Sequence, residues 1–416
     1  MLSKIVQNKI IQESVGNYMK KKVLILVEDL PFKYDNRVKR ETMSLSEHGW
    51  DVTVLSPRAE NGKYFEEINK SIRAYYYPKK DKNSTLGHIF EHTTTIILTL
   101  FYTLFIFFKH RFNVIHACNP MDIFWLIYLP YKLTGAKFLF DQHDLSPEVY
   151  LSRPYSSSRD LFYKILCWLE KKSYRYAHSI IATNESYKEK AIIRGGVDPS
   201  KVFIVRNGPQ LNRFDKVFLD KTEIFKDKSI LEIGYVGNMN LQDGVEEVVY
   251  VCEFLLNELN RKDFKFVLIG GGANQPNLKK LVKNKGLENY IEFTGRIDDN
   301  ILLQRLSKCA FCIQPDPYNE LNNISTMNKI MEYMALGKTF VAYDLKETRV
   351  SGHDCGLYAK INDRRDFSNK IVKFLDDQSL RENLGKRGRE RIENVLEWKY
   401  SVPSLLSAYN NLVKKG

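Results

Sequence analysis

Short runs of β-branched and aromatic residues alternate with helical stretches along nearly the whole chain. The runs that indicate buried strands lie at 22–27, 52–56, 113–117, 137–141, 179–183 and 201–205 in the first half, and at 232–237, 264–272, 290–295, 310–315 and 338–344 in the second. Buried strands that alternate with helices form parallel sheets covered by helices on both faces. The pattern therefore predicts an α/β fold.

A polar stretch between residues 207 and 228 interrupts this alternation. A chain of 416 residues is also too long for one ordinary hydrophobic core, so two domains are expected. We place an N-terminal domain over residues 1–212 and a C-terminal domain over residues 213–392, each with its own doubly wound, Rossmann-like parallel sheet. Two such domains face a cleft, and ligands bind beyond the carboxyl ends of the strands.

The chain carries 63 Lys and Arg against 50 Asp and Glu, which gives a net charge of +13. This excess suits membrane surfaces, nucleic acid or phosphorylated small molecules. The charge is spread along the chain without a recognition motif, so we expect no nucleic acid as a partner. Residues 1–22 lack the apolar stretch of a secretory signal, and the cysteines do not form a zinc pattern. These features favour a cytoplasmic protein.

The segment NKIMEYMALGK, residues 328–338, has the spacing of a helix with one buried apolar face. Ser325 or Thr326 is a candidate cap for the start of this helix, and Gly337 is a candidate end. The helix therefore presents a separate polar face, which is where a ligand would have to bind.

Asn328, Lys329 and Glu332 form that polar face, with Glu332 one turn after the other two. The free N–H groups of a helix N-terminus suit a phosphate, and Lys329 would add a positive charge. Glu332 would accept hydrogen bonds from hydroxyls about 4.5 Å further along the axis, so the spacing matches the diphosphate and ribose of a nucleotide sugar. The alternative is an ordinary i, i+3 ion pair between Lys329 and Glu332 on a solvated face.

Three other loops follow predicted strands. Gly237 and the glycines at 270–272 allow backbone to approach a ligand, although a tight strand-to-helix turn needs glycine as well. His143, after strand 137–141, could contact a sugar hydroxyl or a leaving phosphate, or it could be a loop histidine bonded to backbone. Arg37 could meet an anion in the cleft, or it could simply lie at the exposed start of the next helix.

Several motifs that would indicate other chemistry are absent from the sequence. It has no Gly-Lys-Ser/Thr phosphate loop, no Asp-x-Asp after a strand, no H-E-x-x-H, no G-x-S-x-G and no G-x-G-x-x-G after the first strand. These absences argue against an NTPase, a metal-bound diphosphate, a zinc hydrolase, a serine hydrolase and a dinucleotide enzyme. We therefore expect neither a metal ion nor a cofactor.

Taken together, the segments resemble family-4 glycosyltransferases of the GT-B fold. The segments in question are VLILVEDLPFKYDNRVKRE followed by HGWDVTVLS, FDQHDLSPE, VRNGP, YVGNMNLQDGVEEVV, FTGRI and NKIMEYMALGK, in the family's order. The resemblance covers residues 22–400 and is greatest with the branch that builds bacterial surface polysaccharides. It implies retaining, metal-independent transfer from a nucleotide sugar. It also implies that the N-terminal domain holds the acceptor and that residues 393–416 cross back to close it.

The resemblance also implies roles for individual residues. Glu332 matches the family's ribose-binding glutamate, and Gly295 with Arg296 would lie near the base. His143 matches the cleft histidine near the transferred sugar. We therefore predict His143 and Lys329 as catalytic residues.

This chain departs from the family at the diphosphate and at one glutamate. Ile324 stands where the family often has a second glutamate, eight residues before the ribose-binding one. Asn238 and Gln242 stand where an arginine and a lysine usually hold the diphosphate, and they are predicted to bind substrate without that charge. Lys329 and Arg37 are the candidate substitutes for the missing cations.

The predicted function is transfer of a sugar from a UDP-sugar to a lipid-linked saccharide in capsule, O-antigen or exopolysaccharide synthesis. One alternative is a nucleotide-sugar epimerase on the same fold, which would release a new sugar without an acceptor. Another is a non-catalytic scaffold that binds a nucleotide sugar, since the lost glutamate and the basic charge could mark a degenerate enzyme.

The longest apolar run is IILTLFYTLFIFF, residues 96–108, which is too short to span a bilayer by itself. One interpretation is a buried helix of the first domain. The other is a helix that dips into the inner-leaflet interface, with Lys79, Lys80, Lys82, Lys109 and Arg111 as basic flanks that meet anionic lipids. The second interpretation predicts a peripheral membrane protein.

Overall fold

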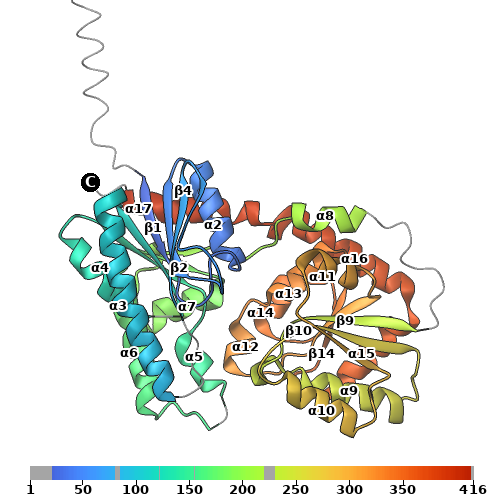
Figure 1. Ribbon diagram of the computed structural model, residues 1–416. Coiled ribbons are helices and arrows are strands. Elements are labelled where there is room, and N and C mark those ends of the chain that lie inside the picture. Colours follow the sequence, from blue (N-terminus) through green and yellow to red (C-terminus); the bar gives the residue numbers. More distant parts are fainter. Residues whose placement is uncertain (1–20, 80–84, 121, 154, 220–229, 414–416) are drawn as a thin grey trace, which may run out of the picture.

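The computed structural model describes residues 21–79, 85–120, 122–153, 155–219 and 230–413. The start of the chain, predicted to lack a secretory signal, and residues 220–229 of the predicted polar linker lie outside the described residues. The described part forms two α/β units, each built around its own sheet (Figure 1).

The N-terminal sheet has eight strands in the order β3-β4-β2-β1-β5-β6-β7-β8. These strands are β1 (Lys22–Leu26), β2 (Asp51–Pro57), β3 (Phe65–Asn69), β4 (Ile72–Tyr77), β5 (Val114–Cys118), β6 (Lys137–Gln142), β7 (Ser179–Ala182) and β8 (Val202–Ile204). All neighbouring strands are parallel except β3 and β4. The strand order reverses between β1 and β5, and a crevice at such a point is where α/β sheets bind ligands.

The C-terminal sheet has six strands in the order β11-β10-β9-β12-β13-β14, and all of its neighbouring strands are parallel. These strands are β9 (Leu231–Asn238), β10 (Phe264–Gly271), β11 (Ile291–Gly295), β12 (Phe311–Gln314), β13 (Phe340–Tyr343) and β14 (Leu357–Ala359). The order reverses between β9 and β12, so the loops after these two strands open the second crevice.

Helices cover both faces of each sheet. They are α2 (Asn36–Glu47), α3 (Thr85–His110), α4 (Trp125–Lys132), α5 (Ser146–Leu151), α6 (Leu161–Tyr176), α7 (Glu185–Ile193), α8 (Asn212–Leu219), α9 (Glu246–Asn257), α10 (Gln275–Asn284), α11 (Asp299–Ser307), α12 (Glu320–Ile324), α13 (Asn328–Ala335), α14 (Lys346–Gly352), α15 (Arg364–Asp376), α16 (Gln378–Arg391) and α17 (Val402–Val413). On the N-terminal sheet, α3, α4 and α6 pack over one face, and α2 and α17 over the other. On the C-terminal sheet, α9, α10 and α15 lie opposite α11 and α13.

Helix α17 lies against β7, β8 and α2, so the end of the chain returns to the N-terminal unit (Figure 1). The predicted strands are all present, but β3, β4 and β14 were not predicted. Strand β3 is exposed along its whole length and pairs antiparallel with β4, so it lacks the buried apolar pattern used for prediction. Helix α8 forms inside the stretch predicted as a polar linker.

Candidate active site

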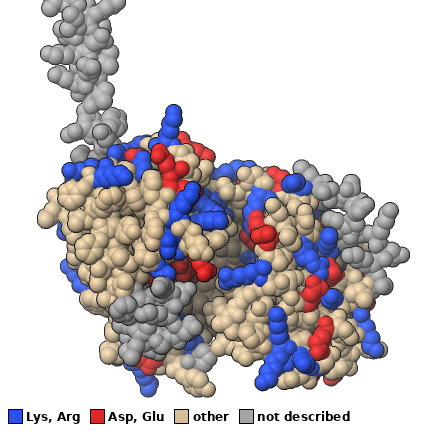
Figure 2. Space-filling view, in the orientation of Figure 1, with Lys and Arg blue, Asp and Glu red and all other residues tan. Residues whose placement is uncertain are grey.

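The molecule is hollowed between its two halves, and charged side chains line the hollow (Figure 2). A pocket of about 170 Å³ lies in this cleft. The residues that line it come from α2, from the segment between the two sheets and from α13, and they are Asn36, Lys39, Arg40, Asn207, Pro209, Gln210, Arg213, Asn328 and Glu332. Two of the predicted ligand-binding residues of α13, Asn328 and Glu332, therefore face the N-terminal unit across the pocket.

Helix α13 begins at Asn328 with Met327 as its N-cap residue, and no side chain caps it. The predicted capping role of Ser325 or Thr326 is therefore wrong. Their hydroxyls bind the N-terminal unit instead. Asn184 Nδ2 donates to Thr326 Oγ1 at 2.9 Å, and the hydroxyls of Tyr187 and Ser325 lie 3.0 Å apart. The segment that leads into α13 is thus fixed by contacts across the cleft.

Ile324, at the position of the missing family glutamate, takes part in the same contact. Its carbonyl oxygen accepts a hydrogen bond of 2.9 Å from Asn184 Nδ2. Its side chain packs against the hydrophobic core of the N-terminal unit. A glutamate here would place a charge against that apolar cluster, so this position joins the two units instead of presenting a carboxylate to the cleft.

Lys329 lies where the C-terminal strand order reverses. Its Nζ is 3.0 and 3.2 Å from the carboxylate oxygens of Asp316, in the loop after β12, and 4.9 Å from the centre of the Tyr235 ring in β9. Burial lowers the pKa of Lys329, but the charge of Asp316 outweighs it and raises the pKa above its usual value. Lys329 is therefore a permanently charged group at the crevice.

Glu332 has a different partner. Its Oε1 accepts a hydrogen bond of 2.7 Å from Nη1 of Arg213 in α8, and Arg213 also binds Asp299. Because Lys329 pairs with Asp316 and Glu332 with Arg213, the alternative of an i, i+3 ion pair between them is wrong. Oε2 of Glu332 has no hydrogen-bond partner among the described residues, which leaves one oxygen for a ligand hydroxyl.

The glycine loops of the C-terminal sheet pack on each other. A Cβ at Gly270 would lie 2.0 Å from the carbonyl oxygen of Gly237, and both residues have positive φ angles. These glycines are therefore required by the close approach of two strand ends, whether or not a ligand binds. The nearby residues with predicted contacts, Asn238 and Gln242, are exposed.

Gly295 and Arg296 lie at the end of β11, two strands from the point where the order reverses. Gly295 has a φ of +73°, and a Cβ added there would meet no atom within 4 Å. The left-handed backbone of the turn, and not a close contact, therefore accounts for this glycine. The exposed Arg296 lies beside Gly271 of β10, with its Cγ 3.6 Å from where a Cβ of that glycine would be. The structure places this pair along the same edge of the sheet as Gly237.

His143 lies in the loop after β6, at the carboxyl end of the N-terminal sheet, and is not among the residues that line the cleft pocket. Its Nε2 lies 2.6 Å from Oδ2 of Asp141, so the ring binds a carboxylate and not backbone. The backbone N–H of His143 donates to Asn119 Oδ1 at 2.7 Å, which connects the loop after β6 to the loop after β5. Burial lowers the pKa of His143, but Asp141 outweighs it and raises the pKa above the usual 6.5.

Arg37 binds the same carboxylate as His143, that of Asp141, and does not line the cleft pocket. Its guanidinium donates to both oxygens of Asp141, at 2.9 and 3.3 Å, and to the carbonyl of Val205 at 2.9 Å. It also lies 3.1 Å from Glu41, which shares its helix face at i, i+4. The structure gives no support to the prediction that Arg37 meets an anion in the cleft, because its side chain is 5% exposed and pairs with Asp141 and Glu41.

Sequence reasoning missed Lys39 and Arg40, which line the pocket from the other side of α2. Asp35 caps α2, and recognition of this cap would have assigned positions 37 and 41 to the inner face. Arg213 and Asp316 were missed as well: Arg213 lies 119 residues from Glu332, and Asp316 lies 13 residues from Lys329, in a separate loop.

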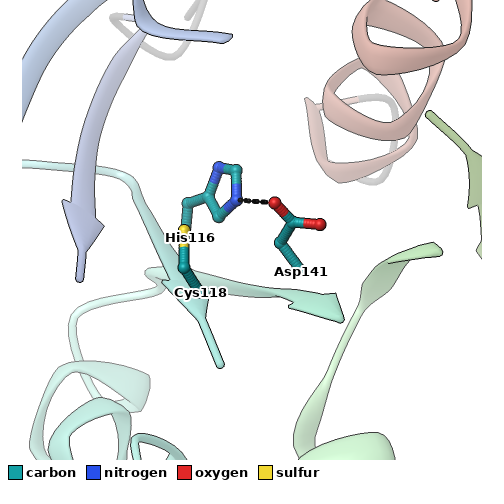
Figure 3. A group of neighbouring side chains, drawn as sticks. All are labelled: His116, Cys118 and Asp141. Atoms are coloured by element: carbon teal, nitrogen blue, oxygen red, sulfur yellow. Dashed lines mark ion pairs between the residues drawn. The ribbon is translucent and has the colours of Figure 1, made fainter. Parts of the chain in front are cut away.

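The buried network also contains His116, Cys118 and Asp141 (Figure 3). Nε2 of His116 lies 3.3 Å from Asp141, and its Nδ1 lies 2.7 Å from the hydroxyl of Tyr409 in α17. The three side chains have metal-ligand chemistry, but the guanidinium of Arg37 already binds the Asp141 carboxylate. Burial also raises the pKa of Cys118 well above its usual value, which disfavours the thiolate that binds metals. The donor set fits an ion-pair network better than a metal site.

Family models match most of the chain. Residues 36–213 match the model described as glycosyltransferase family 4, and residues 231–377 match glycosyl transferases group 1. The chain belongs to the glycosyltransferases. The prediction of the enzyme class from the sequence is therefore confirmed.

Individual relatives agree with this assignment. An uncharacterized glycosyltransferase of Methanocaldococcus jannaschii is 22% identical, over 91% of this chain and 95% of its own. The N,N'-diacetylbacillosaminyl-diphospho-undecaprenol α-1,3-N-acetylgalactosaminyltransferase of Campylobacter jejuni is 28% identical, over 59% and 64%. The capsular polysaccharide biosynthesis glycosyltransferase CapM of Staphylococcus aureus is 25% identical, over 61% and 67%.

Solved structures confirm the GT-B fold of this glycosyltransferase. Sucrose-phosphate synthase from Thermosynechococcus elongatus superimposes with a TM-score of 0.73 at 18% identity, over 95% of this chain and 100% of its own. Anabaena HepE in complex with UDP-glucose gives a TM-score of 0.65 at 13% identity, over 94% and 99%. The predicted architecture of two doubly wound domains is confirmed.

Proposed function

We propose that this glycosyltransferase transfers a sugar from a UDP-sugar to a lipid-linked saccharide, with retention and without a metal ion, in bacterial polysaccharide synthesis. The observation that carries the proposal is the position of Glu332 in the cleft pocket, one turn after Lys329, where its Oε2 has no partner among the described residues. The UDP-glucose complex of HepE supports a uridine nucleotide. The undecaprenol-linked substrate in the name of the Campylobacter relative supports a lipid-linked acceptor.

In this proposal Glu332 holds the ribose, and the diphosphate lies at the N-terminus of α13. Lys329 and the free N–H groups of the first turn supply positive charge that a metal ion supplies in other enzymes. Asn238 and Gln242 contribute hydrogen bonds but no charge, and Gly295 and Arg296 lie nearest the base. Lys39 and Arg40, on the opposite wall of the pocket, add two further cations.

His143 faces the transferred sugar from the N-terminal wall in this proposal. Its Nε2 is bound to Asp141, so Nδ1 is the ring atom left for a sugar hydroxyl or for the leaving phosphate. A raised pKa keeps more of the ring protonated near neutral pH, and a cation here stabilises negative charge that develops on the leaving diphosphate.

Replacement of Lys329 tests the diphosphate site. We expect Lys329→Met to reduce turnover about 100-fold or more, as removal of one preorganised charge does in other active sites. Because Asp316 would remain buried without its partner, the double variant Lys329→Met/Asp316→Asn serves as a control for folding.

The measurement is sugar transfer with and without EDTA. Loss of wild-type activity in EDTA, restored by magnesium or manganese, would overturn metal independence. Sugar released without an acceptor would instead indicate the epimerase.

Peripheral membrane association is the second part of the proposal, and helix α3 carries it. The part of the helix from Thr93 to His110 is long and apolar enough to cross a membrane. Only 28% of this segment is buried within the protein. Three threonines of the helix point inward, and several of its aromatic rings point outward. Thr95, Thr99 and Thr103 are at most 3% exposed, whereas Phe101 and Phe108 are 67% and 69% exposed. Large apolar side chains on the outer face favour a contact with the membrane interface.

Liposome flotation tests this contact. We expect wild-type protein to float with anionic liposomes at low salt, and to be released by salt or alkaline wash, because the flanking Lys109 and Arg111 attract anionic lipids. The variant Phe101→Ser/Phe105→Ser/Phe108→Ser should lose flotation. The buried threonine positions offer a matched control, since Thr103→Val should leave flotation unchanged. If neither anionic nor neutral liposomes retain the wild type, the membrane proposal is wrong.

A further inference from the structure

A second hollow, of about 260 Å³, lies in the N-terminal unit. Basic side chains line it from separate elements: Lys132 ends α4, Lys137 begins β6, Arg175 lies in the last turn of α6, His178 precedes β7 and Lys201 precedes β8. These positions lie at the amino ends of strands β6, β7 and β8. The hollow is therefore at the opposite end of the sheet from the candidate active site, which lies at the carboxyl ends.

The charges around this hollow have no acidic partner in the part of the chain that the structure describes. No aspartate or glutamate lines it, and no ion pair among the described residues includes Lys132, Lys137, Arg175 or Lys201. Some basic residues elsewhere do have carboxylate partners, for example Arg261 with Asp263 and Asp376. Like charges that converge without a counter-charge repel each other, and a bound anion would relieve that repulsion.

His178 adds a neutral donor. Its Nδ1 accepts a hydrogen bond of 3.2 Å from the N–H of Phe138, so the proton of the neutral ring is on Nε2. Burial and then the nearby Lys137, Lys201 and Lys132 lower the pKa of His178, which keeps the ring neutral at pH 7. The charged and imidazole groups around the hollow are thus hydrogen-bond donors.

Stabilisation of helix ends is a simpler explanation for these cations, but it accounts for only two of the four. Lys132 and Arg175 lie in the last turns of α4 and α6, where positive charge stabilises the helix dipole. Lys137 is the first residue of a strand, and Lys201 belongs to a three-residue 3₁₀ turn. Helix ends give no reason for these two lysines to share the hollow with the other cations.

We propose that this hollow, the basic pocket, binds a phosphate or diphosphate group. Its volume of about 260 Å³ has room for such a group. Lysine and arginine are the usual partners of phosphate oxygens. Two sources share this chemistry: a soluble phosphate compound and the headgroup of a phospholipid. Leu133, which follows Lys132, is 93% exposed, as a lipid contact would require.

The test uses the full chain with two pairs of charge reversals. Lys137→Glu/Lys201→Glu alters the basic pocket, and Lys262→Glu/Lys280→Glu makes the same change of net charge at exposed positions of the C-terminal unit. Thermal unfolding is measured with pyrophosphate at constant ionic strength, and flotation is measured with liposomes of phosphatidic acid or of phosphatidylserine at equal surface charge. Lys137→Gln/Lys201→Gln replaces the first variant if that variant does not fold.

We expect the pocket variant, but not its control, to bind the phosphate probe about tenfold more weakly or worse. A smaller rise of the unfolding midpoint with pyrophosphate identifies a soluble phosphate compound as the source. Loss of a preference for phosphatidic acid over phosphatidylserine identifies a lipid headgroup. Identical behaviour of the two variants in both measurements overturns the proposal. That result would leave the proposed glycosyltransferase reaction untouched, because turnover depends on the other end of the sheet.

Discussion

The two walls of the cleft hold their charges in different ways. On the N-terminal wall, Asp141 is fully buried and is bound by Arg37, His116 and His143 from the same unit. On the C-terminal wall, Glu332 is 26% exposed and its partner Arg213 comes from the segment between the two sheets. One wall is therefore a preformed scaffold for a single histidine, whereas the other has a solvated ion pair that a ligand can rearrange.

Asp141→Asn should have the largest effect, because it leaves the buried Arg37 with only Glu41 as an ionic partner. We expect a loss of about 3–5 kcal/mol in the free energy of unfolding, together with loss of transfer activity as His143 loses its orientation. Urea unfolding followed by circular dichroism measures the first effect. The control is Asp263→Asn, whose partially exposed pair with Arg261 should contribute about 1 kcal/mol or less. Equal losses in the two variants would remove the distinction between the walls.

Glu332→Ala should affect ligand binding more than folding. The loss of charge-assisted hydrogen bonds to ribose should weaken donor binding by about 1.5–3 kcal/mol, and the solvated pair with Arg213 should cost little stability. Isothermal titration with the nucleotide sugar measures the affinity. Glu292→Ala is the matched control, because Glu292 is also partly exposed and pairs with Arg305 outside the cleft. An unchanged donor affinity in a folded Glu332→Ala variant would return this residue to a purely structural ion pair.

The smallest expected effect is a pH dependence of stability. The pKa of His143 is raised above 6.5 by Asp141, so the protonated ring stabilises the folded state fully below pH 6.5. That contribution is lost as the pH rises through the folded-state pKa. Burial, and then Asp141, raise the pKa of Glu41 from the usual 4.5 to about 7. The folded state therefore also loses stability as the pH rises from 4.5 through about 7 and Glu41 ionises.

The variant His143→Gln separates the histidine from Glu41. We expect the stability difference between wild type and this variant to be larger at pH 6 than at pH 9, in urea unfolding at constant ionic strength. Glu332→Gln, on the other wall, should show no such change between these pH values. A difference for His143→Gln that is constant with pH would mean that the ring is not an ionic partner of Asp141.

The apolar run at residues 96–108 shows where local pattern alone misleads. Its composition does not distinguish a core helix from an interfacial one, and the structure shows features of both. Ile106 and Phe107 pack in the core, whereas Phe101 and Phe105 remain exposed. The threonines on the buried face reverse the usual rule of apolar residues inside, so a prediction from hydropathy could not assign the faces.

The sequence by itself determined the alternation of strands and helices, the two sheets, and the helix that carries Asn328, Lys329 and Glu332. These features follow from periodicity over a few neighbouring residues, which the chain displays directly. Only the tertiary structure decided the partner of each charge. Arg37 and Asp141 are 104 residues apart, and Arg213 and Glu332 are 119 apart. Electrostatic interactions depend on distance and burial in space, which local sequence does not specify, so the network under His143 and the contacts of Ile324 emerged only from the fold.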